Sequence, residues 1–151
     1  MATPSSQVAS FIAKFDPANA KLIRACRTAM RKRVPSANEL VYDNYNFLAI
    51  GYCTTERTSD CIVSLAASAK GVALSFYYGA ALPDPAKILL GAGKQNRFVR
   101  LEGAAILARP AVAALIDAAV AQAKTPLART GRGYTLVKSV AAKQRPRRAP
   151  A

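Results

Sequence analysis

Hydrophobic and polar positions alternate along the chain in two different periods, and each period occupies its own region. Apolar residues recur at helical spacing over residues 8–15, with Ser5 or Ser6 available as the N-cap. Asp16-Pro17 has the form of an N-cap followed by a proline in the first turn, and it opens a second helix that should end near Arg33. A last helix is predicted from Pro110 to about residue 123.

The middle of the chain, from residue 40 to residue 76, follows the period of a strand. Short glycine-ended connections between the apolar runs suit hairpins. Strands grouped in the middle, with helices at both ends, predict an α+β fold: a single antiparallel sheet of about five strands with helices packed on one face. The strand-like runs are Phe47–Cys53, Cys61–Ala66, Val72–Phe76 and Phe98–Leu101.

Length and composition predict one globular domain in the cytoplasm. A chain of 151 residues with 52% hydrophobic and 20% charged residues can bury a core without metals or disulfides. No leader-like segment opens the sequence, and no apolar run approaches the roughly 18 residues of a membrane span. Three cysteines form no disulfide framework, so reduced thiols and a cytoplasmic location without membrane attachment are expected.

The net charge of +14 is concentrated toward the carboxyl end. Residues 124–151 contain eight Lys and Arg residues and no acid. We therefore expect a globular domain over residues 1–128 and a basic, loosely attached tail over 129–151, in which only Tyr134–Val137 resembles a strand. Such a tail either binds nucleic acid weakly and without sequence preference, through Arg145, Arg147 and Arg148, or is flexible and only solubilising.

The second predicted helix carries a basic face opposite its apolar face. At about 100° per residue, Leu22, Cys26 and Met30 fall on one side. The opposite side is either a solvated surface or an anion-binding surface. Its basic residues are Lys21, Arg24, Arg27 and Arg31.

The chain lacks several kinds of chemistry. It contains no histidine, and its eight acids show no spacing that pairs them on one helix face. Neither a general acid and base pair nor a His-containing metal site is therefore indicated, and no catalytic residue, cofactor or metal ligand is predicted. Cys53 and Cys61 could approach each other across a hairpin, although buried free thiols are the favoured interpretation.

Aromatic residues occur on several of the predicted strands, interleaved with basic residues. They are either half-buried core residues with hydroxyls at the rim or a surface that stacks bases. The period of two sends Phe76 and Tyr77 to opposite faces of the sheet. The set comprises Tyr42, Tyr45, Phe47, Tyr52, Phe76, Tyr77, Tyr78 and Phe98.

The segment around two glycines is the candidate ligand site. Gly91 and Gly93 free the backbone to turn its amides toward one point, and Lys94 and Arg97 follow at once. With Tyr78 from the preceding strand, these residues would hold a small anion. The alternative is a plain flexible turn before Phe98.

A set of motifs resembles a bacterial family. Leu82-Pro-Asp-Pro85, Gly91-Ala-Gly-Lys94, Arg97-Phe-Val-Arg-Leu101, the entry Pro35–Tyr42 and the helix after Arg109-Pro110 together resemble the YdhG-like domains of unknown function, over about residues 6–123. The resemblance implies the frataxin-like two-layer sandwich. It also implies an intracellular iron chaperone, which frataxins achieve through an acidic ridge on the first helix.

Two functions are therefore expected from the sequence. The first is a cytosolic binding module for an anionic partner, namely a small anion, an acidic protein or nucleic acid. The alternative is the frataxin-like iron chaperone, although the helices that correspond to the acidic ridge carry Lys14, Lys21 and Arg24 in this chain, with Asp16 as their acid.

Overall fold

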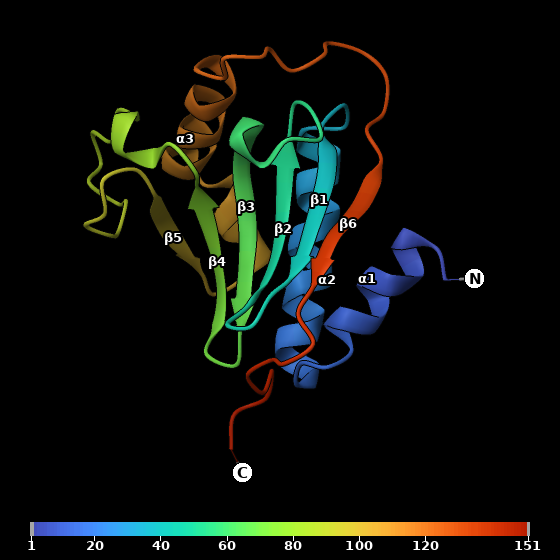
Figure 1. Ribbon diagram of the computed structural model, residues 1–151. Coiled ribbons are helices and arrows are strands. Elements are labelled where there is room, and N and C mark those ends of the chain that lie inside the picture. Colours follow the sequence, from blue (N-terminus) through green and yellow to red (C-terminus); the bar gives the residue numbers. More distant parts are fainter. Residues whose placement is uncertain (1, 151) are drawn as a thin grey trace.

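A computed structural model describes residues 2–150, which form one six-stranded sheet with the order β5-β4-β3-β2-β1-β6 (Figure 1). Neighbouring strands from β5 to β1 are antiparallel, whereas β6 runs parallel to β1. The fold is therefore α+β, as predicted, but the sheet is mixed and has one strand more than expected. The strands are β1 Asn38–Asp43, β2 Leu48–Cys53, β3 Cys61–Ser68, β4 Gly71–Phe76, β5 Arg97–Leu101 and β6 Thr135–Val140.

Helices α2 and α3 lie behind the sheet in the view of Figure 1, and α1 packs beside β6 and α2. The helices are α1 Pro4–Ile12, α2 Pro17–Arg33 and α3 Pro110–Ala121, and the short 3-10 turns are η1 Thr58–Asp60, η2 Gly79–Ala81 and η3 Ala104–Ala108. Among residues 2–150, no helix combines the length and apolarity needed to cross a bilayer.

Local sequence signals explain where the first two helices begin. The side chain of Asp16 accepts a hydrogen bond from the amide of Asn19, at 2.9 Å, and Pro17 opens α2 as predicted. The N-cap of α1 is Thr3 rather than Ser5 or Ser6, because Pro4 occupies the first turn and the Thr3 hydroxyl accepts from the amide of Ser6.

The register of the sheet separates two chemically different faces. One row across the strands is fully apolar and buried beneath the helices: Val41, Ile50, Leu65, Leu74 and Val99. The next row points the opposite way, since successive side chains of a strand alternate between faces: Leu40, Gly51, Ser64, Ser75 and Phe98. The main core therefore lies between the sheet and the helices, and a smaller buried cluster on the other face contains Leu40, Cys53 and Cys61, with Tyr42, Tyr77 and Leu136 packed against it.

The prediction of a loosely attached tail is wrong for the segment that contains β6. Thr135–Val140 pairs with β1 and forms an edge of the sheet, which the chain reaches after passing behind the sheet through α3 (Figure 1). The strand is short and mostly exposed, so its own sequence pattern is weak. It joins the sheet because the backbone of β1, about 95 residues earlier in the chain, has an edge available for pairing.

Beyond β6, the chain is fixed by a buried ion-pair cluster around Asp43. The fully buried Asp43 carboxylate accepts from Lys14 Nζ at 2.5 Å and from Arg147 Nη2 at 2.9 Å, while Gln144 donates to its backbone carbonyl. Burial raises the pKa of Asp43, but the hydrogen bonds from Lys14 and Arg147 outweigh it and hold this pKa below its ordinary value. The structure therefore places Arg147 inside the protein, paired with Asp43, rather than at a surface where it would contact nucleic acid.

Replacing Arg147 should destabilise the protein. Arg147→Ala would leave Asp43 with Lys14 alone, and breaking a buried ion pair typically costs roughly 3–5 kcal/mol, so we expect a loss of at least about 2 kcal/mol. Urea unfolding followed by circular dichroism measures this loss. Arg145→Ala is the matched control, since Arg145 is exposed and its change should cost less than about 1 kcal/mol. Equal losses for both variants would contradict the structural role of Arg147.

Candidate functional site

A strongly basic groove of about 610 Å³ lies between α2 and the connection that leads into β6. Its lining residues are Arg24, Arg27, Thr28, Arg31, Lys32, Pro35 and Arg132, and none of them is acidic. Within the part of the chain that the structure describes, only Arg27 of these cations has an ion-pair partner. We call this surface the α2 groove.

The periodicity of α2 builds one wall of the groove. Arg24, Thr28 and Arg31 recur at intervals of four and three residues and therefore share a face of the helix. The opposite face buries Ile23, Cys26 and Met30 against the sheet. The clustering of Arg31, Lys32 and Arg33 in the last turn is favourable, because the carboxyl end of a helix carries a partial negative charge.

Arg132 reaches the groove from a segment in which glycine is required. A Cβ at Gly133 would lie 1.9 Å from the carbonyl oxygen of Ala37, so any other residue would clash with the backbone there. The Gly133 amide donates to Pro35 O at 2.9 Å, and Gly131 has a φ of +89°. The two glycines on either side of Arg132 were the sequence signal that the backbone is constrained here. They lie in the segment that was predicted to be a loose tail.

A carboxylate whose oxygens already accept several hydrogen bonds lies beneath the groove. Glu39 accepts from Arg27 Nε and Nη2 at 2.8–3.1 Å, from Tyr52 Oη at 2.9 Å and from Thr135 Oγ1 at 2.8 Å. A narrow cleft of about 50 Å³ leads to it, and Arg31, Pro35 and Arg132 line both this cleft and the groove. The one acid near the groove is thus already paired.

The network keeps Glu39 ionised and Tyr52 protonated. Burial raises the pKa of Glu39, but hydrogen bonds from Arg27, Thr135 and Tyr52 and the charge of Arg27 hold it below its ordinary value. Burial and the neighbouring Glu39 carboxylate raise the pKa of Tyr52 well above 10. Since Arg27 neutralises Glu39, the remaining cations of the α2 groove give it a net positive charge.

The structure does not assemble the site predicted at the glycine loop. Arg97 Nη1 donates to the carbonyl oxygens of Gly93, at 2.5 Å, and Asn96, at 2.8 Å, so its guanidinium is used within the loop. Lys94, Gly91 and Gly93 are exposed, and Gly91, with a φ of +110°, packs beside the Phe98 ring. Tyr78 donates to Ser59 O and lines a cavity of about 210 Å³ that none of the other four residues lines.

Two of the three predicted nucleic-acid residues stay at the surface. Arg145 lies over the Tyr45 ring, 5.5 Å from its centroid, and Arg148 Nε donates to Lys14 O at 3.4 Å. Both residues line a surface cavity that also contains Phe47 and Lys70. Arg147, between them in sequence, is buried.

The cysteines are free and buried, as predicted. Cys53 and Cys61 are opposite each other on β2 and β3, and Cys61 Sγ donates to Val63 O. The hydrogen bond with Cys61 and burial raise the pKa of Cys53, and burial raises that of Cys26 to about 11, so both thiols stay protonated at neutral pH. Residues 2–150 contain no group of three or more His, Cys, Asp or Glu residues placed to hold a metal ion.

Comparison with known proteins adds no relative: no family model, curated protein or solved structure matches this chain.

The Glu39 network should make stability depend on pH. A carboxyl with a lowered folded pKa binds fewer protons when folded, so its stabilisation is present above the ordinary value of 4.5 and is lost as the pH falls through the folded pKa. Glu39→Gln should therefore destabilise the protein at pH 7 and flatten the fall in unfolding free energy below about pH 5, leaving the part due to Asp43. Chemical unfolding between pH 3 and 7 measures this change.

Asp117→Asn is the matched control, because Asp117 is largely exposed and pairs with Arg33 at the surface. Its acid profile should follow that of the unmodified protein. A Glu39→Gln profile that also follows it would show that the buried network does not govern acid stability.

Proposed function

We propose that the protein is a binding module for a phosphate-bearing anion, and that the α2 groove is its site. The single observation that supports this proposal is the gathering of Arg24, Arg31, Lys32 and Arg132 around one concavity whose lining contains no acid. Mutually repelling cations held together in this way favour a bound anion of several charges.

Phosphate is the ligand chemistry that suits these side chains best. Arginine presents its donors in a planar fork that matches the oxygens of a phosphate, and three of the four free cations are arginines. Thr28 adds a hydroxyl donor on the same helix face. The volume of about 610 Å³ falls within the range of roughly 300–1,000 Å³ that small-molecule sites occupy.

The residues of the groove have different roles in the proposal. Arg24, Arg31 and Arg132 would contact the ligand directly, with Lys32 adding a fourth charge. Arg27 is a positioning residue, because Glu39 holds its guanidinium from below and leaves it only 15% exposed. A binding module of this kind agrees with the cytoplasmic location expected from the sequence.

The alternative of an iron chaperone has no observation in its favour. Glu39 and Asp43 face guanidinium and ammonium groups, so their oxygens are already occupied. Hard cations such as iron need several free oxygen ligands in one place. The YdhG-like resemblance remains a proposal supported by the quoted motifs alone.

Titration with inorganic tripolyphosphate, followed by calorimetry, tests the proposed function. Arg31→Gln and Arg132→Gln should each weaken binding at least about tenfold, because one charge-assisted hydrogen bond contributes roughly 1.5–3 kcal/mol. Folding should be almost unchanged, since both residues are exposed. Arg129→Gln is the matched control: it removes an exposed arginine three residues from Arg132 that does not line the groove.

Equal weakening by Arg129→Gln would show that the whole cationic surface binds the anion and that the groove is not a site. Undetectable binding to the unmodified protein at 0.1 M salt would also overturn the proposal.

A further inference from the structure

The face of the sheet opposite the helices forms a second, chemically different surface. In the view of Figure 1 this face looks toward the reader, and none of the helices of residues 2–150 covers it. The central strands β2, β3 and β4 present only small side chains there. These are Ala49, Gly51, Ser64, Ala66, Ala73 and Ser75, with the buried thiols of Cys53 and Cys61 at one end of the face.

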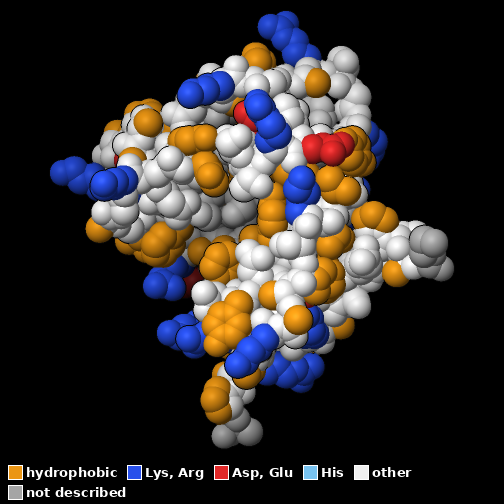
Figure 2. Space-filling model, viewed as in Figure 1, with side chains coloured by type: hydrophobic (Ala, Val, Ile, Leu, Met, Phe, Trp, Pro, Cys, Tyr) orange, Lys and Arg blue, Asp and Glu red, His pale blue; other side chains and the backbone are white. Residues whose placement is uncertain are grey.

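Larger side chains stand at the margins of this face. By register, Phe98 and Arg100 lie on β5, and Tyr42 and Leu136 lie on the other side. Figure 2 shows the face hollowed over the central strands, with hydrophobic side chains around the hollow and basic ones outside them. We call this surface the open trough.

Two adjoining surface cavities, of about 540 and 620 Å³, lie at the lower end of the sheet and share Ser68 and Lys70. The first includes Ala66, Ala73 and Arg100 of the trough and continues round the end of the sheet to Asn19 and Leu22 of α2. The second includes Phe47, Arg145 and Arg148. Together they make a continuous path from the turn before β2, past the β3–β4 hairpin, to β5.

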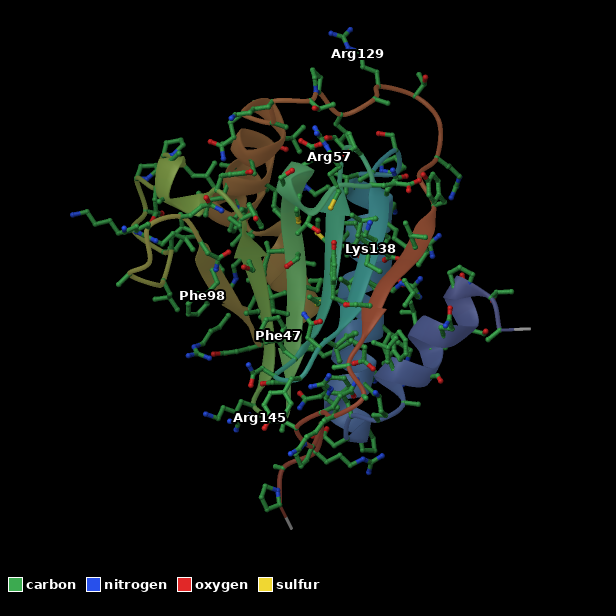
Figure 3. All side chains as sticks on the ribbon, in the orientation of Figure 1. Phe47, Arg57, Phe98, Arg129, Lys138 and Arg145 are labelled. Atoms are coloured by element: carbon green, nitrogen blue, oxygen red, sulfur yellow. The ribbon has the colours of Figure 1, made fainter. Side chains whose placement is uncertain are left out.

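Aromatic rings and cations lie close together at the margins of the trough. Phe98 lies 5.7 Å from the guanidinium of Arg100, and Tyr45 lies 5.5 Å from that of Arg145. Phe47, with 39% of its surface exposed, lies just before the lower end of β2, whereas Phe98 is the second residue of β5 and is level with Gly51 of β2 (Figure 3). Lys70 is exposed between them, and Glu102 is the one carboxylate among the residues that line the two cavities.

This chemistry selects one kind of occupant. A second copy of the chain would bring another net charge of +14 against a cationic rim, so self-association is opposed. A flat membrane does not fit a hollow surface. Flat aromatic groups joined by phosphates match both the hollow shape of the trough and its cationic rim, because bases stack on exposed rings and phosphates pair with Lys and Arg.

We propose that the open trough binds single-stranded nucleic acid. Bases stack on Phe47 and Phe98 and lie over the small side chains of Ala66 and Ala73, while Lys70, Arg100 and Arg145 contact phosphates. Strands spaced at about 4.8 Å put β2 and β5 roughly 14 Å apart, and Phe98 is level with Gly51, roughly 13 Å along the strand from Phe47, so the two rings are roughly 20 Å apart, which corresponds to about six stacked nucleotides. The trough is on the face of the sheet opposite the α2 groove, so this proposal does not rest on the groove.

Fluorescence anisotropy with labelled ten-nucleotide oligo(dT) and oligo(dA), at 50 and 200 mM salt, tests the proposal. Phe47→Leu and Phe98→Leu keep apolar bulk and remove the stacking ring, and each should weaken binding about fivefold or more. The pair Lys70→Gln with Arg100→Gln should reduce the slope of log affinity against log salt by about 1.4, since each contact with a single strand contributes about 0.7.

The double variant Arg24→Gln with Lys32→Gln, in the α2 groove, is the matched control, because it also removes two positive charges. It should weaken oligonucleotide binding much less than Lys70→Gln with Arg100→Gln, and the phenylalanine variants should still bind tripolyphosphate as the unmodified protein does. If the α2 pair abolishes oligonucleotide binding and the phenylalanine variants do not weaken it, the trough is not the site. That result would leave the proposed function of the groove standing.

Nuclear magnetic resonance gives a second readout that does not depend on variants. On addition of oligo(dA), the methyl resonances of Ala66 and Ala73 should shift through the ring currents of stacked bases, whereas that of Ala119, buried on α3, should stay in place. Polyglutamate should not reproduce these shifts. If it does, and if it competes equally with the oligonucleotide, the trough binds acidic protein and the proposal is wrong.

Discussion

Two buried carboxylates on β1 hold the structure together at its edge. Glu39 and Asp43 both point toward the helices, four residues apart on the same face of the strand. Glu39 binds α2 through Arg27 and β6 through Thr135, and Asp43 binds Lys14, at the end of α1, and Arg147. Since breaking a buried ion pair costs roughly 3–5 kcal/mol, these contacts fix α1, α2 and the segment from Thr135 to Arg147 on one strand.

This arrangement also explains why so much positive charge remains free at the surface. The chain has only eight acids, and the two on β1 are used internally. The cations that they pair with, Arg27, Lys14 and Arg147, serve the fold. Cations elsewhere, such as Arg24, Arg31 and Arg132, then have no ion-pair partner among the described residues, and in our proposal their charge attracts the anionic ligand.

The sequence predicted the parts of the fold that depend on neighbouring residues. Asp16-Pro17 marks the start of α2, and the alternation over Val72–Phe76 marks β4, because both signals act within a few positions. It recognised Tyr134–Val137 as strand-like but missed the pairing of β6 and the burial of Arg147, because their partners on β1 lie about 95–105 residues away. The periodicity of α2 predicts its basic face as a possible anion surface. It does not predict that Arg132, from a distant part of the chain, lines the same groove. At the loop around Gly93, the contacts of Arg97 with the carbonyl oxygens of Gly93 and Asn96 favour the alternative of a plain turn.

The alternation of β1 and β2 keeps the two proposed sites chemically separate. On β1, Glu39 supports the α2 groove from one face while Leu40 and Tyr42 contribute to the open trough on the other. On β2, Tyr52 faces the groove while Ala49 and Gly51 form the floor of the trough. The groove has cations without aromatic rings, which favours phosphate alone, whereas the trough combines cations with rings and favours bases. Because substitutions that share no partner across a sheet act almost additively, each site can be changed without altering the other.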